Sequence, residues 1–324
     1  LKFNDILSSQ NKNKLESLVS GYEMIFIDEA QRITNIGINL KILYDTFPHL
    51  KILVTGSSSF ELANKIKESL TGRTYTYKLY PISFSELKQY HNEFELEQEF
   101  LEDFLVYGSY PDVLLEKNIF DKKKNLQELS SSYLYKDLLL LENLKHSDKL
   151  FKLLKLLAFQ IGQEVSINEL GKSLEMSNET VYRYIYLLEQ VFIIHRVSGF
   201  SRNLRKEISK MDKIYFWDLG IRNVLIDNLN SIENRNDIGQ LWENFLINER
   251  LKIGHYKNRY FSHYFWRVYT GSEIDYIEEY DGKLHTFEFK WGDKKAKLPK
   301  SFSETYPGSS FELINRDNFL DFVI

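Results

Sequence analysis

The chain has 324 residues, of which 43% are hydrophobic and 27% charged, which is an ordinary globular composition with room for two or three domains. The lack of cysteine excludes disulfides and cysteine-based metal or catalytic sites, and no apolar run approaches the roughly 20 residues that span a bilayer. With no signal-peptide pattern, we expect a cytoplasmic protein without a membrane partner. A net charge of -4 gives no overall attraction to nucleic acid, so DNA binding would need a local basic patch.

The first predicted elements are a helix and a buried strand that ends in acids. Leu1 to Ser20 has a helical apolar stripe, and Tyr22 to Gln31 is an apolar run that ends in Asp28 and Glu29. Parallel strands covered on both faces have continuous apolar runs, and ligands of such sheets bind beyond the carboxyl ends of the strands. In phosphoryl transfer the first acid would help to hold Mg²⁺ on the nucleotide and the second would activate water. The alternative is an acidic turn that merely ends a strand.

A second strand completes a strand, helix, strand unit. Asn35 to Pro48 has a helical pattern, and Lys51 to Ser59 is an apolar run that ends in small polar residues. Here the sequence resembles the AAA-type P-loop ATPases: IFIDEAQ looks like their Walker B strand and LVTGSSS like the strand that follows it. The resemblance implies that Thr55 and Ser57 sense the γ-phosphate, and that Arg73 in LTGR reaches a phosphate.

The phosphate-binding loop of such an ATPase, G-x-x-x-x-G-K-[ST], does not occur in these residues. Gly171-Lys172-Ser173 matches its last three positions, but a helix pattern precedes it in place of a glycine-rich loop. The chain also opens on Leu1 instead of Met. We therefore expect a fragment whose first strand, phosphate loop and first helix lie outside it, and which by itself binds ATP weakly or not at all.

The next stretch changes from sheet to helix. Ser59 to Glu68 is predicted as a helix and Thr74 to Leu79 as an alternating strand. From Ser83 to about His146 the pattern is helical, with one break at Tyr107 to Pro111. This stretch resembles the small helical lid that follows an AAA core, and a simple helical linker domain is the alternative.

Leu150 to Phe200 contains three helical stretches and then an apolar strand, which is the order of a winged helix. In a helix-turn-helix the second of the paired helices enters the major groove. That placement would expose one face of the helix that begins at Asn178, with the side chains Asn178, Glu179, Tyr182, Arg183 and Tyr186. The face has one cation and one anion, whereas phosphate contacts normally need several cations. DNA contact and protein docking are both open for this segment.

The last third contains the strongest turn signal of the chain. Lys213 to Asp218 is predicted as a strand, and Asp237 to Lys252 as an amphipathic helix that carries Glu243 and Glu249. Asp281-Gly282 then separates two alternating runs, which predicts a hairpin with a two-residue loop. Counting back from the loop pairs Asp275 with Glu288 and Glu273 with Lys290, so two acids face each other. Like charges placed opposite on a sheet are destabilising, and a cation between them would relieve the repulsion.

An acid, a turn and E-x-K on the neighbouring strand, after a helix bearing Glu243, resemble the PD-(D/E)xK nuclease fold. The resemblance implies that Asp275 and Glu288 bind Mg²⁺ or Mn²⁺, that Glu243 completes the metal site, and that Lys290 steadies the attacking hydroxide or the scissile phosphate. A solvated hairpin is the alternative, because E-x-K is a weak motif.

The order of these parts resembles the bacterial and archaeal AAA-family ATPases in which a winged helix and a nuclease-like region of unassigned function follow the core. The predicted class is α/β, with a partial ATPase core at 1–82, a helical lid at 83–146, a winged helix at 147–200 and a nuclease-like domain at 201–324. The first hypothesis is a protein that uses ATP and Mg²⁺ when complete and has a DNA-directed carboxyl-terminal half. A DNA-binding or Mg²⁺-dependent nuclease module with a vestigial ATPase part, and a regulatory interaction protein without catalysis, are the alternatives. Whether the chain forms a homo-oligomer is left open by the sequence.

Overall fold

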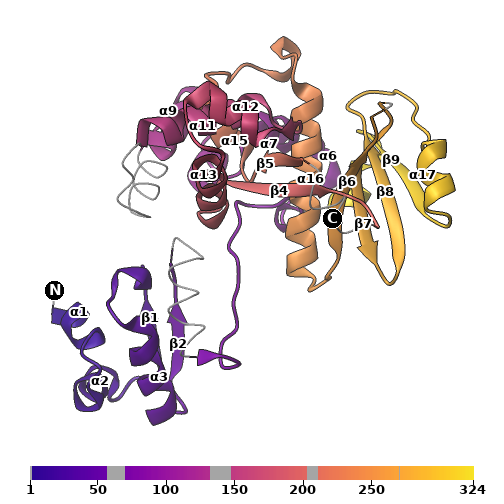
Figure 1. Cartoon of the computed structure of the whole chain (residues 1–324). Coiled ribbons are helices and arrows are strands. Elements are labelled where there is room, and N and C mark those ends of the chain that lie inside the picture. Colours follow the sequence, from indigo (N-terminus) through magenta and orange to yellow (C-terminus); the bar gives the residue numbers. More distant parts are fainter. Residues whose placement is uncertain (1, 57–69, 132–146, 203–210, 270) are drawn as a thin grey trace. The chain divides into compact units, whose positions relative to one another are not determined.

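The computed structural model describes residues 2–56, 70–131, 147–202, 211–269 and 271–324 (Figure 1). The chain divides into two compact units. Unit 1 comprises Leu1–Leu79 and Gln190–Phe192, and unit 2 comprises Tyr80–Glu189 and Ile193–Ile324. Ser57 and the helix predicted at 59–68 lie outside the described residues.

Unit 1 is built on a parallel pair of strands joined by a helix. Its elements are α1 (Lys2–Leu7), α2 (Lys12–Val19), β1 (Met24–Ile27), the 3-10 helix η1 (Ala30–Arg32), α3 (Ile36–Thr46) and β2 (Lys51–Val54). The strands are in parallel register, with Met24 paired to Lys51 and Ile27 to Val54. This arrangement confirms the predicted strand, helix, strand unit. The helical stripe predicted for the first twenty residues forms two helices, the second capped by the side chain of Asn11.

Two details of this sheet differ from the prediction. The helices bury Ile27 with Leu15 and Leu43 in one core, but Phe26 is 55% and Leu53 52% exposed on the opposite face, so the strands are not covered on both faces within the described residues. The strand predicted at 74–79 is also wrong, because that segment has no regular secondary structure. A strand needs a partner that satisfies its backbone groups, and in the described part of unit 1 only β1 and β2 pair.

Unit 2 begins with the helical region that the pattern predicted from Ser83. Its first elements are α5 (Phe84–Leu87), α6 (Glu93–Glu95), the π-helix η2 (Leu96–Phe100), α7 (Leu101–Val106), α8 (Pro111–Leu114) and α9 (Ile119–Leu129). The predicted break is present: α7 ends at Val106, and α8 starts with Pro111 at its first position. Proline suits that position, because its missing N–H would have no partner within the helix.

The rest of unit 2 is organised around one seven-stranded sheet. The helices are α11 (Ser147–Phe159), α12 (Ile167–Leu174), α13 (Asn178–Gln190), α15 (Leu219–Leu225), the 3-10 helix η4 (Ile232–Asn234), α16 (Ile238–Tyr256), α17 (Lys300–Thr305) and α18 (Phe319–Val323). The strands are β3 (Glu164–Val165), β4 (Ile194–Gly199), β5 (Asp212–Phe216), β6 (Ser262–Arg267), β7 (Glu273–Tyr280), β8 (Lys283–Phe289) and β9 (Ser310–Ile314). Their order in the sheet is β3-β5-β4-β6-β7-β8-β9.

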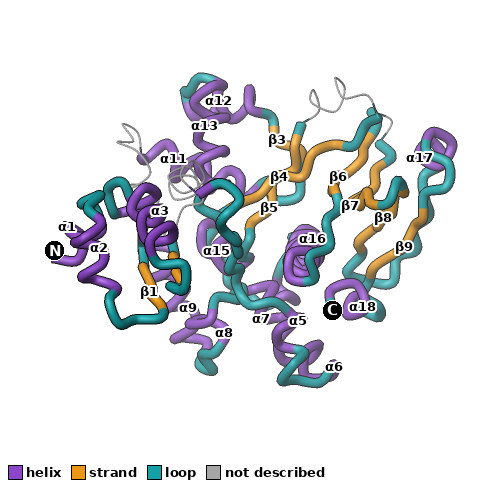
Figure 2. The backbone as a smooth tube through the Cα atoms, turned by 90° about the horizontal axis from the view of Figure 1, so that it is seen from below, coloured by secondary structure: helices purple, strands orange, loops and turns teal. Residues whose placement is uncertain are grey.

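The sheet joins two parts that were predicted from the sequence as separate domains with a boundary at residue 200. β4 pairs antiparallel with β5 along one edge and, through Ser198 and Gly199, parallel with β6 along the other. Figure 2 shows α16 and α18 side by side against the sheet. α17 closes a separate core, in which Phe302 packs with Phe200 and Trp266. The strands before and after residue 200 therefore form one continuous layer.

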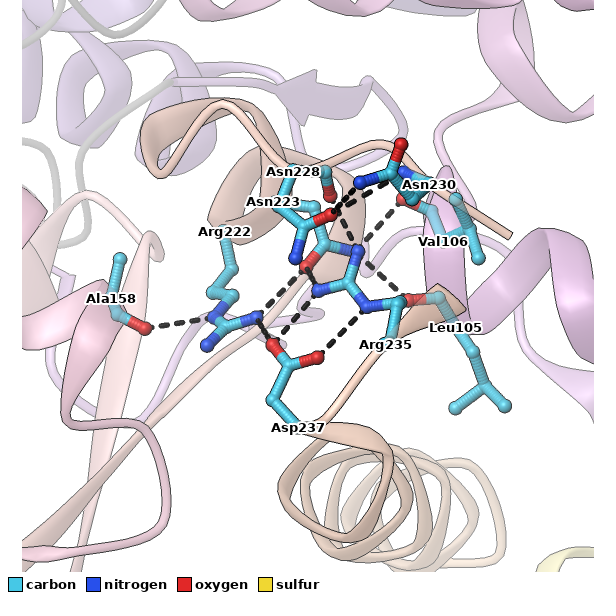
Figure 3. A network of polar contacts seen from close by, with 9 residues as sticks. All are labelled: Leu105, Val106, Ala158, Arg222, Asn223, Asn228, Asn230, Arg235 and Asp237. Carbon is cyan, nitrogen blue, oxygen red and sulfur yellow. Dashed lines mark hydrogen bonds and ion pairs between the residues drawn. The ribbon is translucent and has the colours of Figure 1, made fainter. Parts of the chain in front are cut away.

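A buried polar network fastens the helices of unit 2 to one another (Figure 3). Asp237, which immediately precedes α16, accepts a hydrogen bond from Arg222 at 2.5 Å and is paired with Arg235 at 2.8 Å. Arg222 also donates to the carbonyl of Ala158 in α11, and Asn223 donates to two carbonyls at the end of α7. Both guanidinium groups are buried. One carboxylate thus balances two buried cations from different elements.

Asp237→Asn should destabilise unit 2 by roughly 3–5 kcal/mol, because removing one partner of a buried ion pair leaves the other charge without compensation. Urea unfolding followed by far-UV circular dichroism measures the loss. Glu128→Gln is the matched control, since its exposed pair with Lys124 should contribute less than about 1 kcal/mol. Equal effects of the two substitutions would show that the network does not carry this stability.

Candidate functional sites

The first candidate site lies at the carboxyl ends of β1 and β2. The hydroxyl of Thr55 donates to Oδ1 of Asp28 at 2.5 Å. Backbone bonds hold the two strand ends in place, because the N–H of Thr55 donates to Ile27 and the N–H of Ala30 donates to Thr55. Asp28 is exposed. The structure thus brings together two of the residues predicted from the two strand tips.

Glu29 has an unusual backbone conformation. Its φ of 52° and ψ of 42° lie in the left-handed region, which costs a residue with a Cβ about 1–2 kcal/mol. The side chain is held within its own turn, where Gln31 donates to it at 3.0 Å and Arg32 pairs with it at 3.1 Å. Conformations of this kind gather at functional sites, where the surrounding structure holds them in place.

Arg73 lies elsewhere in unit 1. Its guanidinium pairs with Asp45 at 2.6 Å and lies 5.5 Å from the ring centre of Tyr44. Asp45 is in the last turn of α3, which leads into the start of β2, whereas Asp28 follows the end of β1. In a parallel pair these positions are at opposite edges of the sheet. The structure therefore does not bring Arg73 to the acids within the described residues.

The second candidate site is an acid cluster in unit 2, formed by Glu243, Asp275 and Glu288 with their lysine partners. Glu243, in the first turns of α16, accepts through Oε1 from Lys213 at 3.0 Å and from the hydroxyl of Tyr215 at 2.5 Å. Both donors come from β5, where alternation places them on the same face of the strand. The side chain of Lys213 is only 4% exposed. Sequence reasoning missed these two residues, although the alternation of KIYFWD could have indicated them.

The predicted hairpin supplies the rest of the acid cluster. Its register is confirmed from Tyr280 paired with Lys283 back to Tyr276 paired with Phe287, one residue short of the predicted pair of Asp275 with Glu288. Lys290 pairs with Glu288 at 2.6 Å and with Asp275 at 3.8 Å.

A β-bulge and a backbone bond fix the position of Asp275. Tyr264 pairs with Ile277 and Trp266 with Ile274, so between these pairs β6 has one residue and β7 has two. The extra residue of β7 forms a β-bulge at Asp275 and Tyr276, a device that re-aims side chains. Oδ2 of Asp275 also accepts from the backbone N–H of Phe289 at 2.8 Å. The bulge and this bond together orient the carboxylate toward its charged neighbours.

The charges of the acid cluster perturb one another. Burial, and then the charge of Glu243, raises the pKa of Asp275 to about 6. Burial and Asp275 raise the pKa of Glu288. Burial lowers the pKa of Lys213, but Glu243 and Asp275 outweigh it, so that the pKa is raised overall and the ammonium stays charged. Electrostatics thus favour a proton on one acid and a full charge on the lysine.

The donor set of the acid cluster does not fit the predicted metal site. A divalent cation needs free carboxylate oxygens, but Oε1 of Glu243 is taken by Lys213 and Tyr215, and Oε1 of Glu288 by Lys290. Throughout the described ranges, no group of three acidic or histidine side chains is arranged to hold a metal ion. Glu243 and Glu288 are therefore engaged by protein donors at the positions where the prediction has Mg²⁺.

A third candidate surface is the outer face of α13. Asn178, Glu179, Tyr182 and Arg183 are exposed as predicted, and Tyr186 is half-buried. Arg196, on the neighbouring β4, lies 5.3 Å from the ring centre of Tyr182 but pairs with Glu189 and Asp212. The face is therefore polar and aromatic, and the charge of its nearest arginine is balanced by acids.

Comparison with known proteins supports the AAA part of these expectations. An AAA domain family matches residues 1–88, so the amino-terminal part has an AAA-like, ATPase-type fold. A domain of unknown function (DUF8612) matches residues 98–232, and a second one (DUF4143) matches residues 238–318. Among the described residues, none of the helices combines the length and apolar composition that a membrane span requires.

The relatives found are named as uncharacterized proteins. Rv2008c of Mycobacterium tuberculosis is 26% identical over 271 residues, which cover 82% of this chain and 58% of that protein. MJ1544 of Methanocaldococcus jannaschii is 24% identical over 280 residues, which cover 82% of this chain and 60% of that protein. A protein of Haemophilus influenzae is 24% identical over 208 residues, or 62% of this chain and 50% of its own length. The chain thus spans little more than half the length of these curated relatives.

Asp275→Asn should change the pH dependence of stability. Because the folded pKa is about 6 and the ordinary value is 3.8, the folded state keeps a proton that the unfolded state releases, so stability falls as the pH rises between these values. Asparagine cannot ionise, and the variant should lose this slope and gain up to roughly 3 kcal/mol above pH 6. Urea unfolding at about pH 4.5, 6.0 and 7.5 measures this pH dependence of stability.

Asp281→Asn is the control, because this acid is exposed in the hairpin turn, where asparagine also tolerates a positive φ. Its pH slope should equal that of the parent chain. An Asp275→Asn chain with an unchanged slope would show that folding does not raise the pKa of this carboxyl group.

Proposed function

We propose that this chain is part of an AAA-type ATPase whose complete form binds and hydrolyses ATP, and whose carboxyl-terminal half is directed to DNA. The observation that carries the ATPase part is the bond from Thr55 to Asp28, which joins two strand tips at the carboxyl edge of an α/β sheet. Ligands of such sheets bind at this edge. The match of an AAA domain family to residues 1–88 supports the same assignment.

The proposed roles follow from the chemistry of the two acids. Asp28 is exposed at the strand end and would hold Mg²⁺, whose charge offsets that of the nucleotide phosphates. Thr55 orients the Asp28 carboxylate through its hydroxyl. Glu29 would accept the proton of the attacking water. Its present bonds to Gln31 and Arg32 keep the carboxylate within the turn, so nucleotide binding would have to release it.

Glu29→Gln should lower ATP turnover by the full-length protein about 10²- to 10⁴-fold with little change in nucleotide affinity, because glutamine cannot accept the proton. Asp28→Asn should instead weaken Mg²⁺-dependent nucleotide binding. Phosphate release and titration calorimetry measure the two effects. Glu23→Gln is the control, since this exposed acid precedes β1. Parent-like turnover by Glu29→Gln would remove Glu29 from the mechanism.

The DNA-directed part of the proposal is supported by the order of elements around α13. Along the chain the elements follow the order α11, β3, α12, α13, β4, β5. A short strand thus lies between the first two helices, and two strands follow the third. The strands are antiparallel neighbours in the order β3-β5-β4, as expected of a winged helix. α13 is the second helix of the paired α12 and α13, and its outer face is exposed. Protein docking through the same face is the competing interpretation.

If α13 enters the major groove, Arg183→Ala should weaken duplex binding and make the slope of log K against log salt shallower by about 0.9, the value for one phosphate contact. Fluorescence anisotropy with a labelled duplex at several salt concentrations measures both. Lys124→Ala is the control, because this exposed lysine lies on α9. A chain that fails to bind duplex DNA even at low salt would favour the protein-docking interpretation.

A further inference from the structure

Lys213 lies where the resemblance to nucleases leads one to expect a metal ion. Its ammonium is 3.0 Å from Glu243, and Asp275 and Glu273 are the other acids whose charges act on it. The hydroxyl of Tyr215 completes the donors to Glu243. The side chain of Lys213 thus extends from β5 into the interior, where its positive charge offsets the negative charges of acids on α16 and β7.

Burying a lysine is costly unless acids compensate it. Two other buried lysines are in ion pairs within the described residues. Lys122 pairs with Asp103, and Lys252 pairs with Glu249, which is three residues away on the same helix and also accepts a bond from the N–H of Phe84. Lys213 pairs with Glu243 of α16 and is acted on by the charges of Asp275 and Glu273, so the acids around it come from α16 and from β7. Its position fits neutralisation of an acid cluster better than a local helix pair.

We propose that the ammonium group of Lys213, 3.0 Å from Glu243, takes the place of a divalent cation beside Glu243 and Asp275, and that its removal opens a binding site for Mn²⁺ or Mg²⁺ there. Such ions are commonly held by one or two carboxylates and several waters, so two acids are enough. The parent chain would bind no divalent ion at this position, because an ammonium and a divalent cation repel each other within the same space. The acid cluster is then a built-in ion pair network and not a catalytic metal centre.

The experiment compares the parent chain with Lys213→Met, which keeps the length of the side chain and removes its charge. Without metal the variant should melt at a lower temperature than the parent, since Glu243 loses its counter-ion. Mn²⁺ at a hundredfold excess over its dissociation constant should raise the melting temperature of the variant by about 5 °C. Electron paramagnetic resonance should show one bound Mn²⁺ per chain in the variant. The parent should show neither effect.

Two further variants make the test specific. Lys213→Met with Glu243→Gln should melt near the parent temperature and ignore Mn²⁺, because both members of the buried pair are gone. Lys122→Met is the matched control: this lysine is also buried and pairs with Asp103, and its loss should destabilise the chain without creating a response to metal.

Two outcomes would overturn the proposal. One is Mn²⁺ bound by the parent chain and lost in Asp275→Asn, since the ammonium would then not exclude the ion. The other is a Lys213→Met chain that gains no bound Mn²⁺, whether it folds without metal or stays unfolded at every Mn²⁺ concentration tested. Neither outcome bears on the ATPase proposal, which concerns unit 1 alone.

Discussion

The buried charges of α16 are the constraint on which unit 2 depends. Glu243, Glu249 and Arg250 of this helix have partners in the protein interior, and these partners lie in β5, α5 and β7, respectively. The bonds are Lys213 to Glu243, the N–H of Phe84 to Glu249, and the bidentate pair of Arg250 with Glu278. Because a buried charge without a partner is far more costly than a lost apolar contact, these pairs specify where the sheet and the first helices of unit 2 lie against α16.

The two acid sites of the chain differ in how exposed their carboxylates are and in which groups they are paired with. In unit 1, Asp28 is exposed and has one neutral hydroxyl donor, so that much of its charge stays available to a cation. In unit 2, Glu243 and Asp275 are largely buried and have a lysine within the site. An open acid can bind a metal ion that arrives with its nucleotide, whereas an acid already paired inside the protein must first lose a partner. The exposed acid of unit 1 is therefore better suited to metal-dependent chemistry than the paired acids of unit 2.

Patterns of neighbouring residues predicted the structural features that depend on contacts close in the sequence. The turn chemistry of Asp281-Gly282 fixed the hairpin register as far as Tyr276 paired with Phe287, and the two acids beyond it, Asp275 and Glu288, both lie near Lys290. Helical periodicity gave α3 and the exposed face of α13. What could not be predicted depends on distant contacts. Arg73 pairs with Asp45, 28 residues away, and Lys213 with Glu243, 30 residues away.

The continuous sheet also decides how the two halves of unit 2 can act. β5 pairs with β3, which follows α11, and with β4, which follows α13, and the same strand delivers Lys213 and Tyr215 to the acid cluster. A fragment that begins after residue 200 would lack β4, which lies between β5 and β6 in the sheet. The backbone edges of β5 and β6 that β4 covers would then be exposed. The segment from α11 to β4 and the acid cluster therefore share one sheet, and a partner that displaced β5 would disturb both.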